Sequence, residues 1–144
     1  MGHENVGVIV EAGPTFTDCL LEADFGTWTG AELKALRKKP EWATVQHRPS
    51  AFRFPGGESF AEVQLRIGNA VDGLVERHRG GVVVAVSHAD PIKAAVAHAM
   101  GTHLDLFQRI VISPCSVTAI AYAPTGPTVL TVNSTGDGLA DLKA

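Results

Sequence analysis

The stretch VVVAVSHADPIKAAVAHAMG, Val82–Gly101, decides the fold of this chain. Its first part, VVVAVS, is a continuous apolar run rich in β-branched residues, which predicts a strand buried on both faces, as in parallel sheets. Its second part predicts a helix with Asp90 as N-cap and Pro91 at the first position. His88 is therefore expected between the carboxyl end of a strand and the beginning of a helix.

The flanking segments predict further helices and a hairpin. Apolar residues at helical spacing predict a long helix in residues 58–81, and TGAELKALRKK (29–39) predicts a shorter one with Thr29 as N-cap. Residues 40–57, with three prolines, read as loop. SVTAIAYA (116–123) and TVLTVNS (128–134) predict a C-terminal β-hairpin. This order favours an α/β fold, a three-layer α/β/α open sheet.

Composition limits the possible functions. The 144 residues are 45% hydrophobic and 19% charged, with a net charge of −3, which predicts a single globular domain over residues 1–144. No basic cluster is large enough for nucleic-acid binding. No apolar run spans a bilayer, and no secretory signal is seen. Cys19 and Cys115 are expected as two reduced thiols, which favours a cytoplasmic location.

The position of His88 suggests anion chemistry. Backbone N–H groups and the helix dipole at a helix N-terminus favour anions such as phosphate, and the small Ala89 lets a ligand approach the backbone. A histidine there can donate hydrogen bonds to phosphate or transfer a proton. On spacing alone, an alternative is equally good: His88 as a capping or supporting residue in a tight turn.

Several segments resemble the histidine phosphatase superfamily, also called the phosphoglycerate-mutase-like family, particularly its actinobacterial phosphomutase-type members. They occur in the family's order and cover Cys19 to Gly138. The segments are LLEADFGTWTG (20–30), FRFPGGESFAEVQLR (52–66), VAVSHADPIKAAVAHAMG (84–101), HLDLFQRIVISPCSVTAIAY (103–122) and LTVNSTG (130–136).

The resemblance implies roles for individual residues. Glu22 matches the general acid that protonates the leaving oxygen, and without the resemblance it would read as a solvated carboxylate. His88 matches a histidine that binds the transferring phosphoryl group, and the Ala89 N–H would help to hold it. For Arg66, a structural salt bridge is favoured over phosphate binding. The resemblance implies no cofactor and no metal, and a small phosphorylated metabolite or phosphate ion as the partner.

The family's nucleophile is missing from this chain. It belongs to an Arg-His-Gly motif after the first strand, whereas the only Arg-His pair here is Arg77-His78, followed by Arg79. A second phosphate-binding arginine is missing as well. The chain therefore resembles an N-terminally truncated phosphatase or phosphomutase whose activity is impaired or absent. The alternative is a non-catalytic pseudoenzyme or fragment that acts as an anion-binding or interaction module.

Truncation also has a structural consequence, because it would expose the backbone edge of the VVVAVS strand. An apolar edge of this kind tends to pair with another strand. We therefore expect a homo-oligomer, a dimer, that covers this edge, or a rearranged sheet in which Val6–Val10 fills the gap.

Two other enzyme classes are disfavoured. A metal hydrolase would need histidines at ligand spacing, and the chain has no H-E-x-x-H motif. A serine nucleophile would need a G-x-S-x-G elbow, which Ser87 does not have. Lys93, one turn into the predicted helix, is expected to be solvated.

Overall fold

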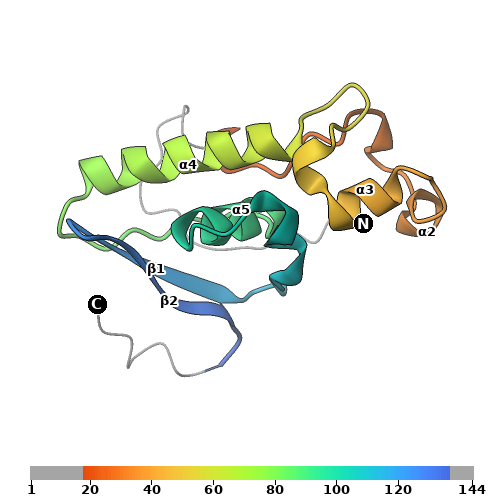
Figure 1. Cartoon of the computed structure of the whole chain (residues 1–144). Coiled ribbons are helices and arrows are strands. Elements are labelled where there is room, and N and C mark those ends of the chain that lie inside the picture. Colours follow the sequence, from red (N-terminus) through yellow and green to blue (C-terminus); the bar gives the residue numbers. More distant parts are fainter. Residues whose placement is uncertain (1–17, 137–144) are drawn as a thin grey trace.

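Helices make up most of the regular structure in residues 18–136, the part of the chain that the computed structural model describes (Figure 1). In chain order the elements are η1 (Gly26–Trp28), α2 (Leu33–Leu36), α3 (Trp42–His47), η2 (Pro49–Ala51), α4 (Phe60–Arg77), α5 (Ala89–Ala99), η3 (Leu104–Arg109), β1 (Val117–Ala123) and β2 (Gly126–Ser134). Helix α5 lies between α4 and the hairpin of β1 and β2 and contacts both. None of the described helices is long and apolar enough to cross a membrane.

The long helix α4 confirms the prediction for residues 58–81. It begins at a capping box, in which the Ser59 side chain accepts from the Glu62 N–H and the Glu62 carboxylate accepts from the Ser59 N–H. One face is buried through Phe60, Val63 and Ile67, as the apolar spacing predicts. The capping box fixes where α4 begins, and the buried face fixes it against the core.

The strand predicted from VVVAVS is not formed among the described residues. Residues 82–88 have no helix or strand assignment, and Val82, Val83 and Val84 are 96%, 42% and 52% exposed. A strand requires a neighbouring backbone for its ladder, and within residues 18–136 none pairs with this segment. The expectation of burial on both faces is therefore wrong for these three valines. The candidate partner Val6–Val10 lies outside the described residues.

The C-terminal hairpin confirms its prediction. Strands β1 and β2 are antiparallel, with Ala123 opposite Gly126 and Val117 opposite Ser134, so the turn consists of Pro124 and Thr125. The register shifts between Val117 and Ile120, which is an irregularity of the β-bulge kind. In residues 18–136 these two strands form the whole sheet. The mixed α/β class is confirmed by this arrangement.

The region between residues 29 and 51 differs from the prediction. The helix expected in residues 29–39 is limited to the single turn of α2, and its N-cap is Glu32, not Thr29. Thr29 instead ends η1, and Gly30 follows with a φ of 77° that redirects the chain before α2 begins. The segment expected to be loop contains α3 and η2. Both are short, and short helices give little periodic signal.

An aromatic cluster forms the core beneath α4. Trp28 is 7% exposed, and Phe60 and Phe107 are essentially fully buried. Phe107 of η3 packs against Phe60 with ring centroids 5.0 Å apart. The cluster of rings in mutual contact comprises Phe25, Trp28, Phe52, Phe54, Phe60 and Phe107. Because these rings come from four separate segments, the cluster joins the loops around η1 and η2 to α4 and η3.

Two glycine loops cross at backbone contact beside this cluster. The Thr27 N–H donates to the Pro55 carbonyl at 2.9 Å, and the Glu58 N–H donates to the Asp24 carbonyl at 2.9 Å. A Cβ added at Gly57 would lie 2.1 Å from the Asp24 oxygen, and one added at Gly26 would lie 2.3 Å from the Pro55 oxygen. The crossing therefore requires glycine at both positions, which gives a physical reason for the FG and PGG sequences.

We predict opposite effects of alanine at two glycines. Gly57→Ala should lower the free energy of unfolding by about 1–3 kcal/mol, because backbone atoms of the facing loop must move to admit the methyl group. Gly68→Ala, inside α4 with only ordinary contacts at 3.9 Å to His98, should raise it by about 0.5–1 kcal/mol. Urea denaturation of both variants measures this difference, and equal effects would contradict the crossing.

Candidate active site

Ser87 joins the beginning of α5 to the segment that carries Glu22. Its hydroxyl donates to the backbone carbonyl of Leu20 at 2.6 Å, and the side chain is only 9% exposed. The two residues are 67 positions apart in the sequence. A buried hydroxyl with a backbone partner holds the two segments in fixed register. This contact brings together two of the predicted site positions, Glu22 and the first turn of α5.

The Glu22 carboxyl occupies an environment that disfavours its charge. Burial, reinforced by the nearby carboxylate of Asp90, raises the pKa of Glu22 from 4.5 to about 7. Hydrogen bonds from the backbone N–H groups of Ala23, at 2.9 Å, and Asp90, together with the charge of Lys93, partly oppose this rise. Near neutral pH the carboxyl is therefore present in both protonated and ionised forms. A carboxyl in this state can donate a proton, as a general acid must.

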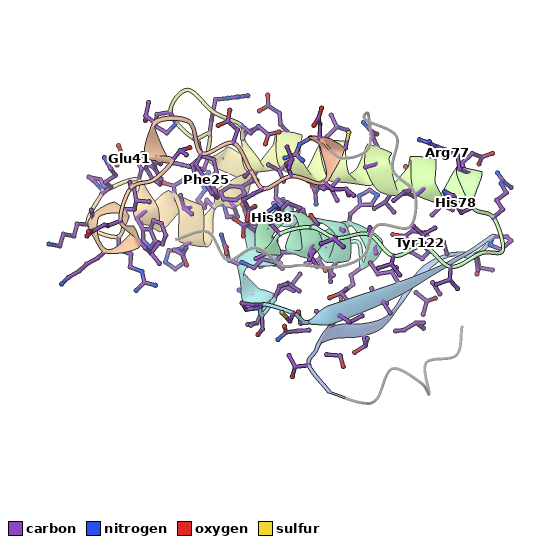
Figure 2. All side chains as sticks on the ribbon, turned by 180° about the vertical axis from the view of Figure 1, so that it is seen from behind. Phe25, Glu41, Arg77, His78, His88 and Tyr122 are labelled. Atoms are coloured by element: carbon purple, nitrogen blue, oxygen red, sulfur yellow. The ribbon has the colours of Figure 1, made fainter. Side chains whose placement is uncertain are left out.

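His88 is the N-cap residue of α5 by its backbone position. Its φ of −107° and ψ of 174° are extended, yet its side chain makes no capping hydrogen bond. The imidazole is half-buried, and Figure 2 shows it at the beginning of α5. The interpretation of His88 as a side-chain cap is therefore not supported. As the N-cap residue, His88 directly precedes the positive end of the helix dipole.

Asp90 and Lys93 form an ion pair across the first turn of α5. The Lys93 Nζ lies 3.1 Å from the Asp90 carboxylate and 3.2 Å from the amide oxygen of Gln108. The side chains of Lys93 and Asp90 are 15% and 18% exposed, and the ammonium lies 5.6 Å from the ring centroid of Phe107. Two predictions are corrected here. Lys93 is not solvated, because its ammonium pairs with Asp90. Asp90 is not the N-cap and Pro91 is not the first helical residue, because α5 begins at Ala89, two residues earlier than predicted, with His88 as N-cap.

Arg66 reaches from the middle of α4 to the backbone around Glu22. Its guanidinium donates to the carbonyls of Cys19, at 2.8 Å, and Leu21, at 3.1 Å, and pairs with Glu58 at 2.8 Å. This confirms the structural salt bridge predicted for Arg66. Burial disfavours the charge of Glu58, but hydrogen bonds from Arg66 and the Asp24 N–H outweigh it, so the pKa of Glu58 lies below its usual value.

Comparison with known proteins decides the family. The family model of the histidine phosphatase superfamily (branch 1) matches residues 7–135. A bifunctional protein of Mycobacterium tuberculosis is 32% identical over 121 residues, which are 83% of this chain and 33% of that protein. The chain belongs to the histidine phosphatase superfamily. It spans about a third of the length of this curated relative.

Other proteins resemble the chain in sequence or in fold. Phosphoserine phosphatase 1 of Hydrogenobacter thermophilus is 33% identical over 95 residues, 62% of this chain and 44% of that enzyme. The solved structure of YhfR from Bacillus stearothermophilus matches with a TM-score of 0.73 and 27% identity, over 80% of this chain and 58% of that chain. A phosphoserine phosphatase from Entamoeba histolytica, solved with 3-phosphoglyceric acid, shares the fold at 19% identity, with a TM-score of 0.69 over 77% of this chain and 57% of that chain. These likenesses confirm the predicted α/β fold of the histidine phosphatase type.

The Arg-His pair of the sequence does not contribute to this site. Arg77 and His78 lie at the far end of α4, well away from His88 (Figure 2). A shallow hollow of about 530 Å³ lies beside the Arg66–Glu58 pair, but none of Glu22, His88 and Ala89 lines it. We therefore place the candidate site at the beginning of α5, where the ionisable groups converge, and not in the hollow.

The described histidines do not gather into a metal site. Within residues 18–136, no three His, Cys, Asp or Glu side chains lie close enough together to hold a metal ion. The other described histidines are spread over different parts of the fold: His47, His78, His98 and His103.

Sequence reasoning missed the contribution of Ser87, Asp90 and Lys93 to this site. The i, i+3 spacing of Asp90 and Lys93 is typical of an ion pair on a helix surface, so the pair itself was accessible from the sequence. The partial burial of this pair could not be predicted from the sequence, because it depends on Gln108 and Phe107 of η3, which packs onto α5.

We predict that Glu22→Gln changes how stability depends on pH. Between pH 4.5 and about 7 the unfolded chain has released the Glu22 proton that the folded chain still holds, so the free energy of unfolding falls as pH rises. The wild type should therefore lose on the order of 3 kcal/mol relative to Glu22→Gln across this range, at about 1.4 kcal/mol per pH unit. Urea denaturation of both proteins at pH 4.5 and pH 8 gives the difference, and parallel pH profiles would contradict the raised pKa.

Proposed function

We propose that this chain, acting as one domain, binds the phosphate group of a small phosphorylated metabolite between Glu22 and the first turn of α5. The observation that carries the proposal is a carboxyl with a pKa of about 7 held against a helix N-terminus that begins at a histidine. Helix N-termini attract phosphate through their N–H groups and dipole. The proposal is also supported by the membership of the chain in the histidine phosphatase superfamily.

Each group in the proposed site has a distinct role. The His88 imidazole and the Ala89 N–H hold the phosphoryl oxygens. Glu22 in its protonated form donates a proton to the leaving oxygen as the P–O bond breaks, because an alkoxide is a poor leaving group. Pro91 has no N–H and the Asp90 N–H is directed at Glu22, so the Ala89 N–H is the backbone donor assigned to the phosphate.

We further propose that turnover by this chain is impaired or absent. Phosphohistidine chemistry needs a nucleophilic histidine to accept the phosphoryl group and arginines to stabilise its charge. The sequence has no Arg-His-Gly motif, and the described Arg66 is committed to Glu58 and to backbone carbonyls. Without those groups, the site retains an anion-binding function. Glu22 can still donate a proton, but there is no nucleophilic histidine to accept the phosphoryl group.

We predict that inorganic phosphate binds and that binding depends on His88. His88→Ala should weaken phosphate binding about tenfold, since a hydrogen bond to a charged group contributes about 1.5–3 kcal/mol. His98→Ala, a histidine exposed on the same helix, should leave the affinity unchanged. Titration calorimetry or phosphorus NMR at pH 6 measures the affinities. Hydrolysis of p-nitrophenyl phosphate by the wild type should stay at the level of Glu22→Gln and of the exposed control Glu32→Gln.

Two results would overturn parts of this proposal. Equal phosphate affinity of the wild type and His88→Ala would remove His88 from the site. Rapid hydrolysis that is lost in both His88→Ala and Glu22→Gln, and kept in Glu32→Gln, would show that the chain has a working nucleophile and that the impaired-turnover proposal is wrong.

The exposed valines support the further proposal of a homodimer. Val82, Val83 and Val84 form an apolar segment next to the site with no ladder partner in residues 18–136. Such a segment is a template for strand pairing between two chains, and lysine on an edge strand blocks pairing. We predict a dimer by light scattering after gel filtration, converted to a monomer by Val83→Lys but not by Leu65→Lys, at an apolar position on α4 that is even more exposed (65% against 42%). A wild type that stays monomeric at high concentration would contradict this.

A further inference from the structure

The Arg66 guanidinium uses all of its hydrogen-bonding capacity inside the protein. Arginine has five N–H donors in a planar fork, and five contacts are formed. The Nε donates to Glu58 at 2.9 Å, Nη1 to the carbonyls of Cys19 and Leu21 at 2.8 and 3.1 Å, and Nη2 to Glu58 at 2.8 Å and, more weakly, to the Glu22 carbonyl at 3.5 Å. No donor is left over for a phosphate group, so Arg66 acts on the chain itself.

Glu58, the ion-pair partner of Arg66, binds the backbone on the other side of Glu22. One carboxylate oxygen of Glu58 accepts from the Asp24 N–H at 3.0 Å. Arg66 and Glu58 together therefore hold the backbone on both sides of Glu22, from the carbonyls at 19, 21 and 22 to the amide at 24. The two side chains are 20% and 24% exposed, so solvent competes little for these contacts.

We propose that the Arg66–Glu58 pair is a positioning clamp that holds the Glu22 carboxyl against the beginning of α5. The inference rests on the proposed function, because Glu22 is the proton donor assigned there. The clamp acts only on the backbone, and the charged groups that face the carboxyl itself are Asp90 and Lys93 of α5. Its effect on Glu22 is therefore geometric: it keeps the carboxyl buried where Ala23 and Asp90 donate to it.

A second Arg–Glu pair of the same region provides a matched control. Arg53 pairs with Glu62 in the first turn of α4, but these side chains are 58% and 49% exposed. Its other hydrogen bond is to the Gly57 carbonyl at 3.0 Å, so Arg53 donates to the loop that faces the Glu22 segment and not to the segment itself. An exposed pair of this kind contributes little to stability, and its loss leaves the backbone at residues 19–24 in place.

The test compares Arg66→Lys with Arg53→Lys in the full chain. Lysine keeps the positive charge but cannot reproduce the fork, so only the bidentate geometry is lost. The readout is the titration of the Glu22 side-chain carboxyl by carbon-13 NMR, assigned through Glu22→Gln. In Arg66→Lys the midpoint should fall by at least one pH unit from about 7 toward its ordinary value, as water reaches the carboxyl. In Arg53→Lys it should not move.

This readout separates positioning from mere stabilisation. A residue that only stabilises the fold would lower the urea midpoint without moving the Glu22 titration of the folded protein. If Arg66→Lys does not fold, Glu58→Gln serves as the second test, because it preserves the shape of the side chain and removes the ion pair. It should shift the midpoint of the Glu22 titration in the same direction. An unmoved midpoint in a folded variant would overturn the clamp.

Phosphate binding in the same samples separates the clamp from the proposed function. If the wild type binds no phosphate while the Glu22 midpoint moves in Arg66→Lys, the proposed function fails and the clamp stands. If phosphate binds in a His88-dependent way and the midpoint is unmoved, the site stands and the clamp is wrong.

Discussion

The described structure depends on the fixed placement of one short segment, Leu20–Asp24, between two helices. Arg66 and Glu58 hold this segment from the side of α4, and Ser87 holds it from the beginning of α5. Partly buried ion pairs are costly to desolvate and contribute little net stability. In this fold the Arg66–Glu58 pair matters for position more than for stability. The five N–H donors of the Arg66 guanidinium fix the Leu20–Asp24 backbone, which has no regular secondary structure of its own.

Glycine makes the same placement possible sterically. The loop after Glu22 passes so close to the loop before α4 that a methyl group at Gly26 or Gly57 would overlap backbone atoms. The hydrogen bonds of the crossing and the clamp of Arg66 therefore reinforce each other. A carboxyl on a mobile loop would be hydrated and ionised at neutral pH. Fixed backbone on both sides of Glu22 keeps its carboxyl partly buried.

The parts of the fold that the sequence predicted correctly are those with local signals. Helix α4 has helical spacing and a capping box, α5 has a proline in its first turn, and the C-terminal hairpin has two β-rich runs about a two-residue turn. The strand expected from VVVAVS failed because a strand depends on a partner, and propensity says nothing of whether a partner is present. Helix α3 was missed because six residues are too few to show a period.

The site was predicted less completely than the fold, for a related reason. Glu22 was selected by resemblance alone, whereas His88 and Ala89 were also indicated by their place before a predicted helix N-terminus, and the roles of all three stay predictions. The buried pair of Asp90 and Lys93 depends on η3 packing against α5, a tertiary contact that no short motif encodes. Arg66 was correctly interpreted as structural, yet its reach to three backbone carbonyls could be seen only in three dimensions.

The electrostatics of the proposed site couple protonation to anion binding. Glu22 is already disfavoured as an anion by burial and by Asp90. A phosphate beside it adds like charge, which raises the pKa of Glu22 further and shifts the carboxyl toward its protonated form. Phosphate binding would then be accompanied by uptake of a proton by Glu22. The bound ligand would in this way favour the protonated carboxyl, the form that can donate a proton to a leaving oxygen. Lys93 limits this effect, because its ammonium pairs with Asp90 and reduces the negative charge that faces Glu22. In the proposed site, this partly buried ion pair would therefore influence how readily a second negative group is accepted.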